Sequence, residues 1–224
     1  MARTCRNVAR YSCWFCCLCC PCYLLTPALA ADLPITIHPD HPNAVTFSGE
    51  EARFVRFVIA PGGSSSSEPC IDELEVYGPA GPANLAVAGG GARVTASSCL
   101  GGYPQHAIPH LNDGLYGNDR SWIAAGTGEE WAQIELPAPS MVSKVVFSRD
   151  RLGRYADRVP VAFEVRLSMD GERWKTVAKV RGRAAAGATG AATGGAPALP
   201  APPPPPAPLR GAPAIEACAP ELLP

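Results

Sequence analysis

The sequence lacks an excess of charge of either sign. Its 224 residues include 19 Lys or Arg and 20 Asp or Glu, which gives a formal net charge of −1. A protein that binds nucleic acid needs a basic face to neutralise phosphates and release their counterions. The balance of charges therefore argues against nucleic acid as a partner, and equally against a membrane contact that depends on charge.

Signals of several other protein classes are also missing. No stretch repeats apolar residues at helical spacing over as many as three turns. The apolar run at 13–25 is interrupted by Pro21 and is too short to predict a membrane span. No G-x-S-x-G motif presents a nucleophile, and Pro109 between His106 and His110 rules out a zinc pair on one helical face.

Cysteine is nearly confined to the first 22 residues, which contain seven of the ten. Arg3, Arg6 and Arg10 precede the apolar run, and "ALAA" at 28–31 offers small residues for cleavage. This layout predicts a signal peptide over residues 1–30 and hence a secreted or extracytoplasmic protein. Two of the cysteine pairs have the C-x-x-C spacing of a zinc site, but no second group of ligands completes such a site.

Composition divides the rest of the chain into three parts. Residues 31–46 have the character of a short leader, 47–180 of strands and loops, and 181–224 are rich in Ala, Gly and Pro. The last part, centred on "PALPAPPPPPAPLRGAP", offers too little apolar surface to offset the entropy cost of ordering it. We expect a disordered tail, through which a neighbouring domain or protein could be attached.

Six segments have the alternation or the apolar run of a β-strand: 52–60, 70–78, 130–136, 143–149, 162–168 and 174–180. In 70–78, Leu74 and Val76 are expected to face the core, while Glu73 and Glu75 face solvent. A tight turn at Asp170-Gly171 joins the last two segments. Short strands separated by long polar loops predict an all-β sandwich or jelly roll.

Five motifs follow one another in a characteristic order. "NLAVAGGGARVTASS" (84–98) is followed by "HLNDGLYGNDRSWIA" (110–124), "EEWAQIEL" (129–136), "SKVVFSR" (143–149) and "VRLSMDGERW" (165–174). In this order they resemble the discoidin domain, also called the coagulation-factor type C or galactose-binding-like domain. The resemblance implies a discoidin-like β-sandwich (jelly roll) of the kind found in large secreted bacterial proteins.

Two strands of the family pattern are displaced in this chain. Relatives usually close with an "ARYVR" strand and an "EIEVYG" strand, whereas "ARFVRFVIA" (52–60) and "CIDELEVYG" (70–78) come before the Asn-Leu-Ala motif here. Either the domain is circularly permuted, so that these strands close the sandwich from the N-terminal side, or they are the remnant of a preceding copy. We favour permutation, because an open sandwich would leave an unpaired apolar edge.

The resemblance also implies a role for residues 110–122, "HLNDGLYGNDRSW", which we call the Asp-Gly loop. In many carbohydrate-binding relatives this loop surrounds a structural calcium ion, which a Glu of the last strand also binds. The corresponding candidates for Ca²⁺ are Asp113, Asn118 and Glu73, or Glu75 in place of Glu73. No other cofactor is expected.

One residue of the Asp-Gly loop departs from the family pattern. The position two residues before the Trp is commonly Thr, and here it is Arg120. An ion pair of Arg120 with Asp113 or Asp119 could therefore fix the loop in place of the ion. Trp122 itself is expected in the core, where an aromatic side chain buries a large area.

The resemblance places ligands on loops at one end of the sandwich. Residues 99–110 and 149–158, the second of which we call the arginine loop, carry the planar polar groups and aromatic faces that sugar recognition needs. The excess of Arg suits an acidic or sulfated glycan. The alternative is that the charged side chains of these loops pair with one another on a solvated surface. Neither loop carries the exposed pairs of apolar side chains that membrane-binding relatives have. The candidate ligand-binding residues are Tyr103, His106, Arg149, Asp150, Arg151, Tyr155, Asp157 and Arg158.

Only two cysteines lie in the part of the chain predicted to fold, Cys70 and Cys99. In a secreted protein they are candidates for a disulfide. Their pairing would leave Cys218, in the predicted tail, unpaired.

These features predict a secreted, non-catalytic module that binds a carbohydrate or cell-surface glycan. A structural or protein-docking module of a larger surface assembly is the alternative. A hydrolase that uses two carboxylates among Asp113, Asp150 and Asp157 is a further one, but the loops of a small sandwich rarely build the cleft that it would need.

Overall fold

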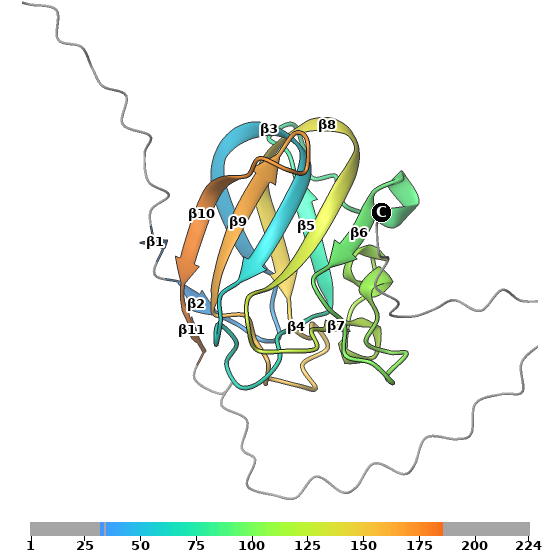
Figure 1. Cartoon of the computed structure of the whole chain (residues 1–224), viewed down its shortest axis with the longest axis vertical. Coiled ribbons are helices and arrows are strands. Elements are labelled where there is room, and N and C mark those ends of the chain that lie inside the picture. The colour runs from blue at the N-terminus through green and yellow to red at the C-terminus, as the bar shows by residue number, and fades with distance from the viewer. Residues whose placement is uncertain (1–31, 34, 186–224) are drawn as a thin grey trace, which may run out of the picture.

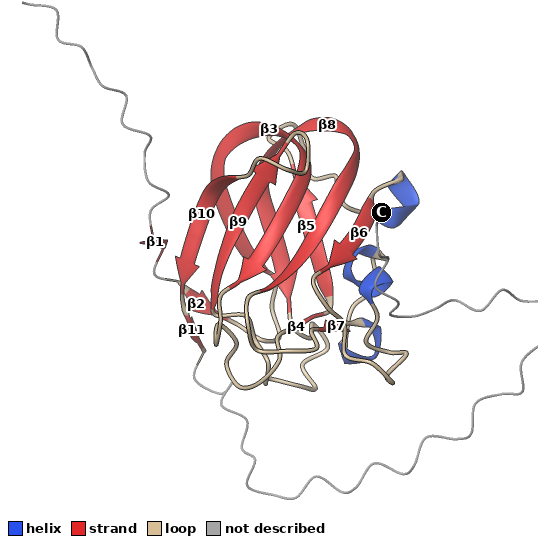
Figure 2. Ribbon diagram, in the orientation of Figure 1, coloured by secondary structure: helices blue, strands red, loops and turns tan. Residues whose placement is uncertain are grey.

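The computed structural model describes residues 32–33 and 35–185. The predicted signal peptide, Cys218 and most of the predicted tail lie outside these residues. The described part contains short 3₁₀ helices, none of them long and apolar enough to cross a membrane, and strands (Figures 1 and 2). The strands are β1 (Asp32–Leu33), β2 (Thr36–Ile37), β3 (Asn43–Ile59), β4 (Cys70–Ile71), β5 (Glu73–Tyr77), β6 (Arg93–Ala96), β7 (Trp122–Ile123), β8 (Glu130–Ser148), β9 (Ala162–Ser168), β10 (Lys175–Arg181) and β11 (Arg183–Ala184), and the helices are η1 (Ala88–Gly90), η2 (Ile108–Asn112) and η3 (Asn118–Arg120).

Seven strands form one sheet in the order β1-β10-β9-β3-β8-β5, with β6 also paired to β8. Neighbouring strands run antiparallel except for β1 and β10, which are parallel. Two small pairs, β2 with β11 and β4 with β7, complete the sheet structure of the described residues. The topology confirms the all-β fold.

The strands β3 and β8 are long enough to belong to both layers of a sandwich. Residues 54–59 of β3 pair with 130–135 of β8, and this part of the sheet continues into β9, β10 and β6. Residues 43–52 of β3 pair with 140–147 of β8, and this part continues into β5. Figure 1 shows the two strands curving over together, so that the sheet folds back on itself.

The bend falls where the pairing of β3 and β8 is interrupted. Residues 136–139 of β8 have no partner in β3, and residues 47–49 of β3 have none in β8. Pro137 and Pro139 lack the N–H group that a ladder of hydrogen bonds needs, and Gly49 weakens the opposite strand. Unpaired residues of this kind form bulges, which increase the local twist and let a strand change direction.

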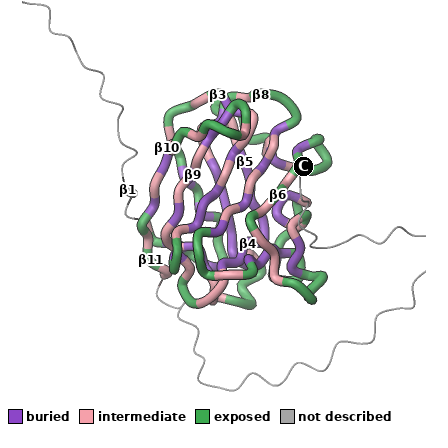
Figure 3. Tube along the Cα trace, viewed as in Figure 1, coloured by how far each residue is buried: buried purple, intermediate pink, exposed green. Residues whose placement is uncertain are grey.

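The core lies between the two layers. Phe57 of β3 stacks on Phe163 of β9 with ring centroids 4.3 Å apart, and Phe147 of the other layer lies 4.9 and 5.1 Å from them. Trp122 is fully buried, as predicted, and its Nε1–H donates to the carbonyl oxygen of Ser98 at 2.8 Å. Figure 3 shows burial following the strands and exposure at the turns. Aromatic contacts thus join one layer to the other.

Several predicted strands agree closely with the structure. Residues 162–168 form β9 with the predicted bounds, and residues 130–136 alternate as expected, with Ala132, Ile134 and Leu136 buried. Residues 145–148 are buried in succession, as predicted for a strand covered on both faces. The segments 130–136 and 143–149, predicted as separate strands, belong to the single strand β8.

The prediction for residues 70–78 is wrong for one face. Leu74 and Val76 are buried as expected, but Glu73 and Glu75 are buried as well. The helix η2 contacts β5, and the N–H of Leu85 donates to the carbonyl oxygen of Val76 at 2.8 Å. The second face of β5 is therefore covered by chain segments that follow it.

The fold extends beyond the predicted limits of 47–180 on both sides. Residues 43–46 pair with 144–147 of β8, so the end of the predicted leader belongs to β3. At the other end, β10 includes Arg181, and Arg183 and Ala184 pair with Thr36 and Ile37. The first residues of the predicted tail are therefore part of the fold.

The strands β3 and β5 belong to the same sheet as β8 and β9. β3 lies between β8 and β9 along most of its second half, and β5 pairs with β8 from Glu73 to Tyr77. Both strands thus close this sandwich from the N-terminal side, which agrees with the permuted arrangement. They are not the remnant of a separate copy.

Candidate functional site

The Asp-Gly loop and the arginine loop pack against each other at one end of the sandwich, the lower end in Figure 2. Gly117 has a φ of +105°, and a Cβ added to it would lie 2.6 Å from Cδ1 of Leu152. Only glycine suits both the backbone angle and the close approach. The two loops therefore share one surface.

Asp72, between β4 and β5, connects these loops from inside the fold. Its Oδ2 accepts the N–H of Gly117 and the N–H of Arg151, each at 2.9 Å. Its Oδ1 is buried and accepts no hydrogen bond from the described residues. Because a buried carboxylate that accepts backbone N–H groups fixes them strongly, Asp72 sets the spacing of the two loops.

Arg149 was predicted to contact a ligand, and this is wrong for the structure, because its side chain is only about 2% exposed. Its Nε donates to the carbonyl oxygen of Asp157 at 2.8 Å and its Nη2 to Oδ1 of Asp157 at 2.7 Å. Its Nη1 donates to Oδ1 of Asn118 at 3.0 Å. Arg149 therefore ties the end of the arginine loop to the Asp-Gly loop.

Asp150 is also buried rather than presented to a ligand. Its Oδ2 accepts the N–H groups of Arg154 and Tyr155, both at 2.9 Å, and its Oδ1 accepts that of Leu152 at 3.1 Å. An Asp that accepts the N–H groups of the residues after it is a common way to close a loop. The carboxylate of Asp150 fixes the arginine loop from within.

His106 is the third predicted ligand residue that the structure buries. Its Nδ1 lies 2.8 Å from Oγ of Ser121, which donates to the carbonyl oxygen of Asn118. Burial lowers the pKa of His106, because it disfavours the charged imidazolium. The neutral ring links the 99–110 loop to the Asp-Gly loop, while Tyr103, next to it, stays exposed.

The four arginines of the arginine loop all pair with carboxylates. Arg149 and Arg158 contact Asp157, Arg151 contacts Glu75, and Arg154 contacts Asp119 at 3.1 Å. Arg158 also contacts Glu68, and its backbone adopts a left-handed φ of 57° at the end of the loop. The predicted preference for an acidic or sulfated glycan loses its basis, because the positive charges are neutralised within the fold.

Three exposed side chains of this surface were not among the predicted residues. Tyr116 is 40% exposed, with its ring 4.0 Å from the guanidinium carbon of Arg151 and its hydroxyl 3.2 Å from Oε1 of Glu75. Leu115 and Leu152 are more than half exposed. Neither of the loops 99–110 and 149–158 has an exposed pair of Leu residues, but Leu152 of one and Leu115 of the Asp-Gly loop are exposed singly. Tyr116 and Leu152 lie in loops, where alternation gives no signal.

Of the predicted residues, Tyr155 is the most accessible in the arginine loop. It is 41% exposed, and its ring centroid lies 5.5 Å from the guanidinium carbon of Arg149. We call the side chains of Leu115, Tyr116, Leu152, Arg154 and Tyr155 the two-loop surface. It presents two aromatic faces, each backed by an arginine, above a network of buried charges.

Glu73 lies directly beneath the Asp-Gly loop and is fully buried. The N–H of Gly114 approaches its two carboxyl oxygens at 3.2 and 3.3 Å, which are long distances for such bonds. Burial raises the pKa of Glu73 to about 9, and the nearby charges of Asp113, Glu75 and Asp72 act in the same direction. Glu73 is therefore protonated at neutral pH.

The residues predicted to bind calcium do not fit that ion. Oδ2 of Asp113 accepts the Nε–H of Arg120 at 3.0 Å, and the two side chains form an ion pair, which is one of the expected alternatives. Oδ1 of Asn118 accepts from Arg149, and Glu73 is neutral. Calcium needs six to eight oxygen ligands, whereas guanidinium groups already donate to the side-chain oxygens of Asp113 and Asn118.

Cys70 is a free thiol, so the predicted disulfide between Cys70 and Cys99 is not formed. Cys70 lies in β4, opposite Ile123 of β7, and is fully buried. Burial raises the pKa of this thiol to about 11. Because only the thiolate is reactive, Cys70 is an inert part of the core.

One cavity of the described chain, of about 50 Å³, is lined by residues of 59–69 together with Thr127 and Gly128. Ligand pockets usually enclose roughly 300–1,000 Å³. A sugar ring would not fit there, and the two-loop surface remains the stronger candidate for binding.

Comparison with known proteins gives one match. No curated protein and no solved structure matches the chain. Residues 93–198 match the family model of the F5/8 type C domain, which covers the strands from β6 onward and begins after β3 and β5. Domains of this family bind carbohydrates or act as docking modules, occur in extracellular proteins and are typically non-catalytic. Residues 93–198 of this chain are therefore similar to the F5/8 type C, or discoidin, domain.

Proposed function

We propose that this protein is a secreted, non-catalytic module that binds a neutral glycan at the two-loop surface. The observation that carries the proposal is the pair of exposed tyrosines, Tyr116 and Tyr155, each with its ring beside an arginine of the same site. An aromatic face packs against the C–H side of a sugar ring, and neighbouring polar groups bond its hydroxyls. Arg154 and the tyrosine hydroxyls supply such groups.

The buried network supports binding because it orders the loops in advance. Asp72, Asp150 and Arg149 fix both loops through hydrogen bonds of 2.7 to 3.1 Å. A surface that is ordered before binding loses less conformational entropy when the ligand arrives. The exposed tyrosines are therefore carried by loops whose conformation is already fixed before a ligand binds.

Pairing of the arginines supports a neutral ligand over a sulfated one. Each guanidinium of the arginine loop has a carboxylate partner, and Arg149 is buried. A sulfate group would have to compete with these carboxylates. Affinity should therefore depend weakly on salt, since little net charge is neutralised.

The remaining parts of the proposal have separate support. The layout of residues 1–30 supports secretion.

The carboxylates of the loops argue against hydrolysis. Asp113 pairs with Arg120, Asp157 pairs with Arg149, and Asp150 is buried and accepts backbone N–H groups. A glycosidase needs an acid and a base that both reach the substrate, and these carboxylates are committed to the fold.

A glycan array followed by calorimetry on the full chain tests the proposal. Tyr155→Ala should weaken binding of the best neutral glycan about tenfold, given the roughly 0.5–1.5 kcal/mol that aromatic contacts contribute beyond the area they bury. Met169→Ala is the matched control, because Met169 is similarly exposed but lies in the β9–β10 turn. We expect no change in that variant.

Two outcomes would overturn the proposal. Binding that survives Tyr155→Ala and Tyr116→Phe together would place the ligand elsewhere. A folded chain that binds no glycan on the array would favour the protein-docking alternative, with the exposed Leu115 and Leu152 as its apolar contacts.

A further inference from the structure

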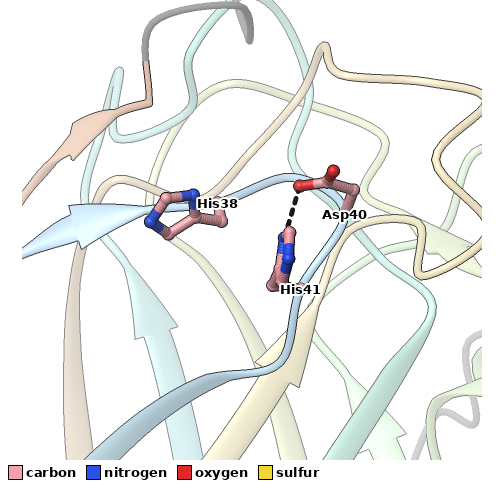
Figure 4. Close-up of side chains that lie close together, drawn as sticks. All are labelled: His38, Asp40 and His41. Carbon is pink, nitrogen blue, oxygen red and sulfur yellow. Dashed lines mark hydrogen bonds and ion pairs between the residues drawn. The ribbon is translucent and has the colours of Figure 1, made fainter.

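A second group of side chains lies outside the two-loop surface, on the turn between β2 and β3. His38, Asp40 and His41 occur within the segment "IHPDHPN", and all three are exposed. One ligand atom from each residue lies within 4.8 Å of the others. Figure 4 shows the three side chains beside one another on this turn, with the bond between Asp40 and His41 drawn.

Hydrogen bonds of the Asn43 side chain stabilise the turn that carries these side chains. The Nδ2 of Asn43 donates to the carbonyl oxygens of His38 at 2.8 Å and His41 at 3.1 Å, and its Oδ1 accepts the N–H of His38 at 2.9 Å. Pro39 and Pro42 restrict the backbone on either side of Asp40. A preordered turn lowers the entropy cost of gathering ligands around an ion.

The turn is also connected to the arginine loop. The carbonyl oxygen of Pro39 accepts the N–H of Asp150 at 3.0 Å. A Cβ added to Gly153 would lie 3.8 Å from Cβ of Asp40. The backbone positions of His38 and His41 are thus determined by the rest of the fold as well as by the turn itself.

We propose that His38, Asp40 and His41 bind a divalent transition-metal ion of the Zn²⁺ class. Two imidazoles and one carboxylate are ligands that Zn²⁺ and its neighbours prefer, whereas Ca²⁺ takes oxygen ligands only. Three protein ligands leave one tetrahedral position open to solvent. This group differs from Asp113, because Asp40 pairs with His41 and, among the described residues, with no Arg or Lys.

Binding of the ion would replace the hydrogen bond between Asp40 and His41 by three bonds from the side chains to the metal. Nδ1 of His41 now lies 2.7 Å from Oδ1 of Asp40, with a proton between them. The ion takes the place of that proton, which is released to solvent if the ring is charged and is replaced by a proton on Nε2 if the ring is neutral, and both atoms become ligands. The ring of His38, whose centroid lies 5.5 Å from that of His41, supplies the third ligand by rotating toward them.

Calorimetric titration of the full chain with Zn²⁺ alone tests the proposal. Accessible thiols are first blocked with N-ethylmaleimide, because the cysteines of the first 22 residues would otherwise compete for the ion. We expect one equivalent to bind. His38→Ala and His41→Ala should each weaken that binding at least about tenfold, and Asp40→Asn should weaken it as well.

His110→Ala is the matched control, because it removes a histidine that lies outside the cluster. Melting curves in EDTA should be the same for all variants of the cluster, since their side chains are exposed. Zn²⁺ should raise the melting temperature of the wild type and not that of the His38→Ala/His41→Ala double variant. Equal Zn²⁺ affinity of wild type and double variant, or an equal loss in His110→Ala, would overturn the proposal.

Discussion

Replacement of Glu73 by Gln tests the electrostatics beneath the Asp-Gly loop. Glu73 is fully buried, its nearest donor is the N–H of Gly114 at 3.2 Å, and its pKa is raised from 4.5 to about 9. The folded protein therefore retains a proton that the unfolded chain has lost. Glutamine has the same shape without the ionisable proton, so Glu73→Gln should fold normally.

The sign of the pH effect follows from proton linkage. Where the folded state binds more protons than the unfolded state, stability falls as pH rises. For Glu73 this window runs from the ordinary pKa of 4.5 to about 9. One such proton changes the free energy of unfolding by about 1.4 kcal/mol per pH unit. The advantage of the wild type over Glu73→Gln should therefore decrease by about 2.7 kcal/mol between pH 6 and pH 8.

Urea denaturation of the full chain at pH 6, 7 and 8 measures this difference. Effects of other titrating groups cancel when wild type and variant are compared at each pH. Glu172→Gln is the control, because Glu172 is an exposed carboxyl group in the β9–β10 turn, and its difference from wild type should not change with pH.

Two results would refute this reasoning. A difference between wild type and Glu73→Gln that stays constant with pH would mean that Glu73 has an ordinary pKa in the fold. A Ca²⁺-dependent gain in stability of the wild type, abolished by Glu73→Gln, would mean that Glu73 is ionised and binds calcium. The second result would also mean that the contacts of Arg120 and Arg149 with Asp113 and Asn118 do not prevent calcium from binding.

Three further predictions concern the core and the loops. Arg149→Met should lower the free energy of unfolding by about 2–4 kcal/mol, because three hydrogen bonds of a buried guanidinium are lost. Arg154→Met removes an exposed ion pair and should lower the free energy of unfolding by less than about 1 kcal/mol in the same urea titration. Trp122→Ala should cost about 3–5 kcal/mol by that assay, since the side chain is fully buried. Cys70 should resist iodoacetamide at pH 8 in the folded protein and react in urea, as peptide mapping by mass spectrometry would show, because its thiol is buried with a pKa of about 11.

Sequence patterns located most strands because burial alternates along a half-covered strand. The segment 162–168 alternates cleanly, and β9 has those bounds. The continuity of β8 could not be predicted, because Pro137 and Pro139 normally indicate a strand end. The structure instead uses them at the bend, where β8 has no partner in β3.

Residue type predicted where the candidate site lies better than it predicted which of its side chains face solvent. Arg149, Asp150 and His106 do lie where the loops meet, yet their polar groups face inward. Period-two alternation ends with the strands, so the direction of a loop side chain has no signal in one sequence. Burial of Glu73 depends on η2, a distant segment that covers β5. The close spacing of His38, Asp40 and His41, which alternate with Pro39 and Pro42, was a signal that could have been used.

The chain enters and leaves the fold through parallel pairs of short strands. β2 pairs with β11, and β1 pairs with β10, in both cases with the two strands pointing the same way. A pull on the two ends therefore drags these strands past each other along their length. All the hydrogen bonds of a pair then bear the load together instead of opening one by one. We expect this domain to resist tension along the chain better than its few terminal contacts suggest.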